Sequence, residues 1–172
     1  MSARAHALPW PRGLSDSSCR HYSTSTRVGD LSRILVAPVA APASEWIEAD
    51  PAVTSWTWFL PTAKAMLQLT FLPAGWDSRS ARQIERPTIE RAIGLLAEVL
   101  DRRAAQPAIV PTIQGGVQAE WHMGGLNVEI EFAPGGEAVV SLEDLLDGTE
   151  WQGELRTEIE RLRPYLLRLE VA

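Results

Sequence analysis

Residues 115–132 read GGVQAEWHMGGLNVEIEF, and this stretch decides the fold. On each side of Gly124-Gly125, apolar and polar residues alternate with a period of two, which is typical of half-buried strands. A two-residue glycine loop between two such runs is a β-hairpin signal. The stretch therefore predicts two antiparallel strands, over residues 117–123 and 126–132, joined by a tight turn.

The glycine turn also fixes the predicted pairing of the two strands. With Gly124 and Gly125 as the loop, Met123 faces Leu126, and Glu120 faces Glu129. One face of the hairpin is then apolar and forms a core face. The other face carries six candidate binding residues, which are Gln118, Glu120, His122, Asn127, Glu129 and Glu131.

Two carboxylates that face each other destabilise a hairpin, and three readings of this pair remain open. The first is a solvated face, where water and salt screen the repulsion. The second is a binding surface for a partner that supplies Arg or Lys. The third is a metal site formed by Glu120, His122 and Glu129, because carboxylate and imidazole ligands suit zinc, manganese or iron. In this third reading Asp77 lies nearby as a base.

Three other stretches have helical periodicity. Residues 87–103 begin with a proline, which suits the first helical turn, and carry an apolar stripe. Residues 62–72 predict a shorter helix with Thr62 as its N-cap. A third helix is predicted from Leu155 onward, with Pro164 as a kink or break.

Further strands complete the predicted sheet. Residues 108–113 read as a strand that Pro111 confines to a sheet edge or a bulge. Residues 137–144 read as another, and the Asp147-Gly148 turn signal returns the chain through TEWQGEL as a possible fifth strand. The order of helix, four or five antiparallel strands and helix predicts a two-layer α+β domain. One face of its sheet is covered by two helices and the other is open.

The N-terminal part of the sequence differs from the rest. Residues 1–50 are rich in Ser, Ala and Pro, which predicts a disordered or arm-like segment ahead of a single domain over residues 51–172. Residues 53–60, VTSWTWFL, predict a short strand or a docking arm, whose tryptophans could form an interaction surface.

Charge and composition exclude several classes of function. The net charge is -6, and residues 116–163 hold eleven acidic residues against three arginines. Such a half repels phosphate backbones, so we expect no nucleic-acid partner. No run of about 18 apolar residues predicts a membrane span. The single cysteine, Cys19, excludes an internal disulfide framework and indicates a cytoplasmic protein.

Two motifs carry a resemblance to a known group of proteins. The sequence LPAGWDS at 72–78 precedes a helix, and IVPTIQGGVQAEWHMGGLNVEIEFAPGG follows at 109–136. The order resembles small uncharacterised bacterial proteins that have a GWDS-type turn followed by a P-x-x-x-GG-V-Q-x-EW segment. The resemblance covers about residues 69–136. It implies an α+β domain of bacterial or phage origin and no particular activity.

The GWDS turn adds two residues to the candidate binding surface, Trp76 and Asp77. Each also has a structural reading, because Asp77 could cap the segment that follows and Trp76 could close an edge of the core.

These observations favour a non-enzymatic protein-protein interaction module that uses the acidic sheet face. Its expected partner is a protein with a basic surface, and an antitoxin-like or immunity-like role is a special case. No cofactor is expected under this reading. The alternative is a metal-dependent enzyme, with a divalent metal held by the Glu/His site on the same face.

Overall fold

The computed structural model describes residues 51–170, so the predictions for residues 1–50 lie outside the described part. The helices are α1 (Pro51–Thr54), α2 (Phe59–Leu69), α3 (Arg86–Val99) and α4 (Leu155–Arg168). The strands are β1 (Ala108–Pro111), β2 (Val117–Met123), β3 (Leu126–Phe132), β4 (Ala138–Asp144) and β5 (Thr149–Glu154).

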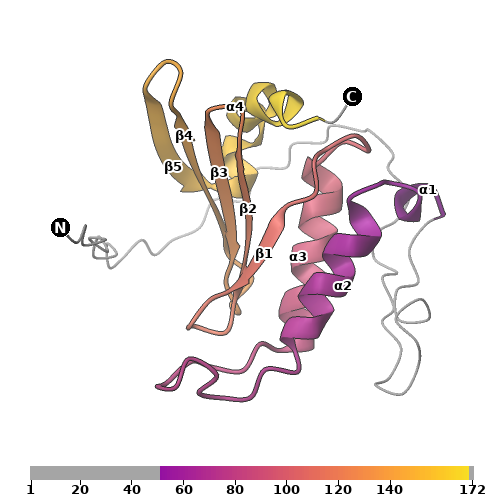
Figure 1. The fold of residues 1–172 in the computed structure, drawn as a ribbon, viewed down its shortest axis with the longest axis vertical. Helices are drawn as coiled ribbons and strands as arrows, with labels where there is room; N and C mark the ends of the chain where they lie inside the picture. The colour runs from indigo at the N-terminus through magenta and orange to yellow at the C-terminus, as the bar shows by residue number, and fades with distance from the viewer. Residues whose placement is uncertain (1–50, 171–172) are drawn as a thin grey trace.

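The strands form one five-stranded sheet in the order β1-β2-β3-β4-β5, and every neighbouring pair is antiparallel. Each strand thus pairs with the one before it in the chain, as short loops between antiparallel strands allow. Figure 1 shows the sheet with α2 and α3 on one side and with β5 as the outer strand farthest from them. The predicted α+β class with an antiparallel sheet is confirmed, and the fifth strand is present.

The predicted register of the glycine hairpin is also confirmed. Met123 pairs with Leu126, and Glu120 pairs with Glu129. Gly124 and Gly125 have φ angles of 61° and 76°, values that residues with a side chain rarely adopt. The turn chemistry therefore sets which residues face the core.

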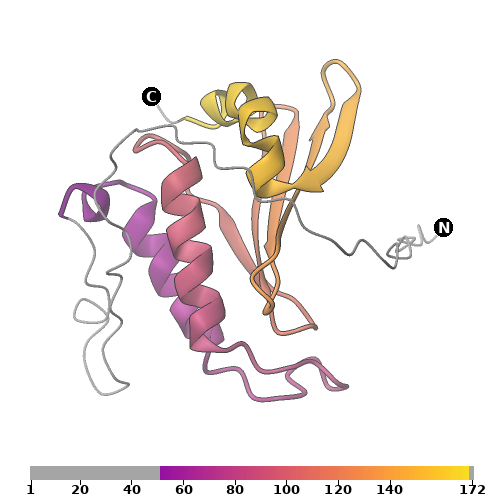
Figure 2. The same ribbon diagram turned by 180° about the vertical axis from the view of Figure 1, so that it is seen from behind.

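All the long helices cover the same face of the sheet. α2 packs against β1 and α3, α3 packs against β2, and α4 packs against β4 and β5. Figure 2 shows these helices from behind, with α3 next to α2 and with α4 nearer to β4 and β5. The strands contribute the alternate residues that face the helices, among them Val128, Ile130 and Val140, each 0% exposed. The other face of the sheet has no described helix on it.

One short segment after α3 ties the two groups of helices together. The Trp121 indole of β2 donates a hydrogen bond to the Ala105 carbonyl at 2.8 Å. The Ala105 amide donates to the carbonyl of Leu169, just after α4, at 2.7 Å. Ala105 therefore joins the sheet, the end of α3 and the end of α4.

The prediction for residues 53–60 is wrong. They form neither a strand nor a docking arm but the helix α1, a turn and the start of α2. Trp58 is 1% exposed, and its indole donates to the Asp101 carbonyl at 2.8 Å. Trp56 is half-buried beside it, with the two ring centroids 5.8 Å apart. These aromatic residues close the core and do not form an exposed surface.

The helix predicted over residues 62–72 begins and ends three residues earlier than expected. Residue Thr62 is buried inside α2, and Trp58 takes the N-cap position. Pro61 lies in the first turn, where a missing N–H costs nothing because those amides have no partner within the helix. Pro61 is therefore compatible with a helix that begins at Phe59, ahead of the predicted N-cap Thr62.

Three other predicted boundaries differ from the structure. α3 ends at Val99 because Leu100 turns to an extended conformation, with φ −90° and ψ 142°. β1 ends at Pro111, since the amide of Thr112 turns back to the Gly116 carbonyl at 3.0 Å. α4 continues through Pro164.

Candidate functional site

The open face of the sheet is acidic across four strands. The strand pairing places alternate residues of β2 to β5 on this face. Six glutamates stand on it: Glu120, Glu129, Glu131, Glu143, Glu150 and Glu154. Its other polar strand residues include Gln118, His122, Asn127, Ser141 and Gln152, and the alternating positions contain no Arg or Lys. The face therefore carries uncompensated negative charge.

Glu120 and Glu129 face each other, but each has its own neighbour along the strands. Glu129 Oε2 accepts a hydrogen bond from Gln118 Nε2 at 2.7 Å. Glu120 Oε2 lies 3.4 Å from His122 Nε2. Because Gln118 and His122 flank Glu120 on opposite sides, these contacts satisfy the two carboxylates in different directions and moderate their repulsion.

His122 begins a hydrogen-bonded chain that crosses three strands. Its Nδ1 lies 3.0 Å from Asn127 Oδ1, so this nitrogen carries the proton. Asn127 Nδ2 in turn donates to Glu143 Oε2 at 2.7 Å. The hydrogen bond to Asn127, followed by the contact with Glu120, raises the pKa of His122 above its ordinary value. The chain thus favours a charged imidazolium next to the acidic residues.

Glu131 has a different environment from the other glutamates of the face. It pairs with Gln118 on one side and with Val139 on the other. Partial burial beside this apolar neighbour raises its pKa above the ordinary value. Its ionised form is therefore poorly solvated when nothing binds to the face.

The acidic face is hollowed over β3, β4 and β5. The hollow measures about 400 Å³. Its polar lining comes from Asn127, Glu129, Ser141, Glu143, Glu150 and Gln152. Three carboxylates in one open hollow suit an arginine or lysine side chain that enters from a partner.

The geometry does not favour the metal-site alternative. Among residues 51–170, no group of three or more His, Cys, Asp or Glu side chains is arranged to hold a metal ion. Of the three predicted ligands, Glu129 is hydrogen-bonded to Gln118, while Glu120 and His122 contact each other. A divalent metal at this site stays a prediction.

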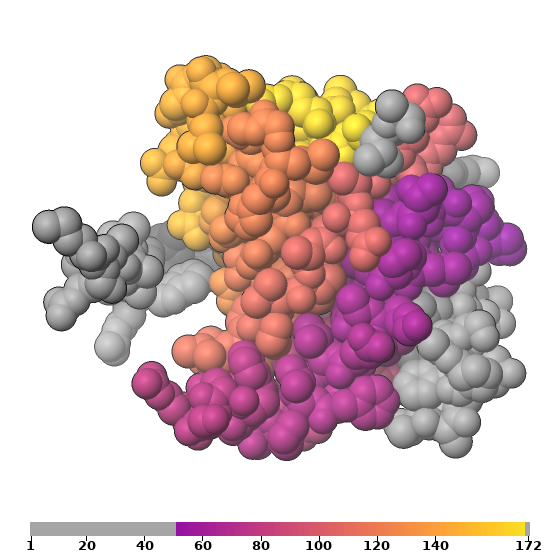
Figure 3. All heavy atoms as spheres, viewed as in Figure 1, coloured from indigo at the N-terminus to yellow at the C-terminus, as the bar shows by residue number. Residues whose placement is uncertain are grey.

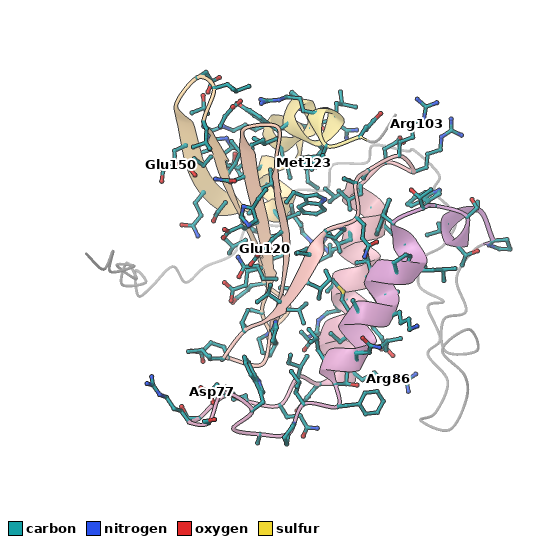
Figure 4. All side chains as sticks on the ribbon, viewed as in Figure 1. Asp77, Arg86, Arg103, Glu120, Met123 and Glu150 are labelled. Atoms are coloured by element: carbon teal, nitrogen blue, oxygen red, sulfur yellow. The ribbon has the colours of Figure 1, made fainter. Side chains whose placement is uncertain are left out.

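Trp76 and Asp77 lie apart from the acidic face. Figure 4 shows Asp77 in the loop below the sheet, well separated from Glu120 and Glu150. Asp77 Oδ1 accepts hydrogen bonds from the backbone amides of Ala81 at 3.0 Å and Arg79 at 2.9 Å. These hydrogen bonds lower the pKa of Asp77. The cap that was one reading of Asp77 is therefore present, and Asp77 does not stand near His122 as a base.

The sequence-based choice of candidate residues stopped at the glycine hairpin and missed half of the face. Ser141, Glu143, Glu150 and Gln152 lie on it, and all four line the hollow. The alternation within residues 137–144 and 149–154 carries the signal for them. The exact pairing does not follow from the turn signal, because a two-residue loop at Asp147-Gly148 would place Glu143 opposite Gln152, whereas the observed loop spans residues 145–148 and places Glu143 opposite Glu150.

No helix within residues 51–170 combines the length and the apolarity that crossing a membrane requires. Comparisons with family models, with curated proteins and with solved structures found no match to this chain.

Proposed function

We propose that this protein is a non-enzymatic interaction module that binds the basic surface of a partner protein through its open sheet face. The observation that carries the proposal is the set of six glutamates on β2 to β5, with no Arg or Lys at the alternating strand positions of that face. Electrostatic complementarity between such a face and a basic surface speeds association and selects partners.

The hollow supports the same function. Side chains that line it from β3, β4 and β5 supply carboxylates as well as neutral acceptors such as the Ser141 hydroxyl and the Gln152 amide. A guanidinium group from the partner would find several acceptors there, and its planar donors match carboxylates in pairs. Basic surfaces of this kind belong to proteins that act on nucleic acids. A cytoplasmic antitoxin-like or immunity-like role, in which the acidic face covers a basic active surface, is the special case that we favour.

The test is purification of the tagged protein from its own host, followed by native mass spectrometry. We expect a complex with a second polypeptide that salt dissociates, because exposed charges are screened. The variant Glu120→Lys with Glu129→Lys should fold normally and lose the partner.

A matched control separates position from net charge. Glu98 lies on α3 and Glu160 lies on α4, and both are exposed residues of helices and not of the open sheet face. The variant Glu98→Lys with Glu160→Lys changes the net charge equally and should keep the partner. Retention of the partner by the Glu120/Glu129 variant, or equal loss in both variants, contradicts the proposal.

A further inference from the structure

The outer strand β5 offers an unpaired backbone edge. It has six residues, contains no proline and pairs only with β4 among the described strands. The opposite edge strand, β1, is shorter and ends in Pro111, and α2 packs against it. A strand edge with free N–H and C=O groups is a template for another strand unless something covers it. Of the two edges, β5 is the one suited to pairing.

Exposed apolar side chains lie at the start of this edge. Leu145 and Leu146, in the loop between β4 and β5, are 61% and 75% exposed. A side chain at Gly125 would lie 3.1 Å from Leu146, and the Leu145 amide donates to the Gly125 carbonyl at 2.8 Å. The two hairpin tips therefore stand side by side, and Figure 3 shows the β4–β5 hairpin at an outer corner of the molecule. Exposed apolar groups next to an open edge are typical of protein-protein contacts.

The side chains of β5 indicate which strand would fit. Glu150 and Gln152 are exposed on the open face, next to the hollow. On the other side Trp151 is 8% exposed, and the Arg161 guanidinium carbon lies 4.5 Å from its ring centroid. A strand beside β5 therefore meets acid on one face and, on the other, the side chain of Arg161 over the nearly buried Trp151 ring.

A second copy of this chain is a poor occupant for the edge. In an antiparallel pair of β5 strands centred on Gln152, each Glu150 would face a Glu154, and directly opposed like charges destabilise a sheet. Charged edge residues of this kind act against self-pairing. The same charges favour a strand that carries Arg or Lys at alternate positions.

We infer that β5 binds an extended segment of the partner protein as a sixth strand of the sheet. Alternate Arg or Lys side chains of that segment face Glu150 and the hollow, and its apolar side chains lie toward Trp151 and the leucines of the loop. Backbone hydrogen bonds supply affinity and the alternate side chains supply specificity, as in other cases of strand addition. This inference rests on the proposed function and specifies how the partner is held.

The test uses a synthetic peptide of alternating Arg and Val, about ten residues long, which exceeds the length of β5. Binding to the full-length, ¹⁵N-labelled protein is followed by fluorescence anisotropy and by amide hydrogen exchange. We expect slower exchange of amides within Thr149–Glu154. A control peptide of the same sequence, with two adjacent central residues N-methylated, keeps its charge but loses backbone donors. It should bind about tenfold more weakly or worse.

Variants on the protein side complete the test. Glu150→Lys with Gln152→Lys should abolish binding of the Arg/Val peptide, whereas Glu98→Lys with Glu160→Lys should not. Absence of binding, equal affinity of the N-methylated peptide, or binding without protection of β5 amides would each overturn the inference. These outcomes leave the proposed function to its own test, because the loss of a natural partner from the Glu120/Glu129 variant does not depend on strand addition.

Discussion

Glu131 and His122 are titratable residues of the acidic face whose pKa values both lie above normal, so both make stability fall as the pH rises, each in its own pH range. The fold disfavours the charged form of Glu131 and favours the charged form of His122. For a carboxyl group, a raised folded-state pKa means that the native protein holds its proton more tightly than the unfolded chain does. For Glu131 stability therefore falls as the pH rises from the ordinary value of 4.5 through the higher folded-state pKa. At neutral pH the ionised side chain is a cost of folding.

We therefore expect Glu131→Gln to stabilise the protein at pH 7. The gain should be modest, because the side chain is only partly buried, and it should vanish below about pH 4, where Glu131 is protonated in both states. Urea denaturation at both pH values, followed by tryptophan fluorescence, measures the difference. Glu98→Gln, at an exposed position on α3, is the control and should change little at either pH. An equal gain at both pH values would refute burial as the cause.

His122 gives a pH dependence of the same direction in a higher pH range. Its folded-state pKa is raised, so the stabilisation is fully present below the unfolded pKa of about 6.5 and disappears as the pH rises through the folded pKa. We expect His122→Gln to lower the urea midpoint more at about pH 5.5 than at about pH 8.5. An Asn127→Ala variant that keeps the pH dependence of the wild-type protein would show that the hydrogen bond from Asn127 does not raise the pKa.

At the scale of elements, the glycine pair Gly115-Gly116, which precedes β2, is needed for packing as well as for the turn. A side chain at Gly116 would lie 2.4 Å from the Phe132 carbonyl oxygen, which is backbone and cannot move aside. We expect Gly116→Ala to destabilise the protein by roughly 1–3 kcal/mol, as overpacking does. Gly94→Ala is the matched control, because nothing lies within 4 Å in mid-α3 and alanine favours helix. It should stabilise the protein by about 0.5–1 kcal/mol. Urea denaturation measures both, and a neutral Gly116→Ala would contradict the close approach.

α4 is held to the sheet by an ion pair that the sequence did not indicate. Asp144, at the end of β4, is 2% exposed and pairs with Arg168 in the last turn of α4. This pairing lowers the pKa of Asp144, and removal of one partner leaves a buried charge unpaired. We expect Arg168→Met to lower the melting temperature clearly. Arg163→Met, which removes an exposed pair with Glu160 on the same helix, should change it little. Equal decreases in melting temperature for the two variants would contradict a stabilising role of the Asp144–Arg168 ion pair.

The elements differ in how far sequence alone predicts them, for physical reasons. The glycine hairpin and its register follow from two signals that agree, the period of two and a turn that needs positive φ angles. The start of α2 differs from the prediction because Thr62, a residue type that favours the N-cap, lies inside the helix. Pro61 is tolerated in the first helical turn, so it does not prevent a start at Phe59. The partners of Glu129 and Asn127 depend on rotamers and on the neighbouring strand β4, which the local pattern of one hairpin does not encode.

At the scale of the whole molecule, the described residues form one continuous core. Buried apolar residues from Val53 to Leu169 belong to a single cluster. Two hydrogen bonds join segments that are distant in sequence around this core. The Trp58 indole donates to the Asp101 carbonyl, and the Ala105 amide donates to the Leu169 carbonyl. A single core of this kind usually unfolds in one cooperative step.

We therefore expect the fragment of residues 51–172 to fold by itself and to unfold in a single transition. Its urea midpoint and its m-value should match those of the full-length chain, since the m-value scales with the surface that unfolding exposes. Circular dichroism and tryptophan fluorescence should give coincident curves, because α1 to α4 and the sheet share the same core. A free energy of unfolding lowered by about 1 kcal/mol or more, or separate transitions for the two probes, would show that residues 1–50 contribute to the fold and that the domain begins earlier than residue 51.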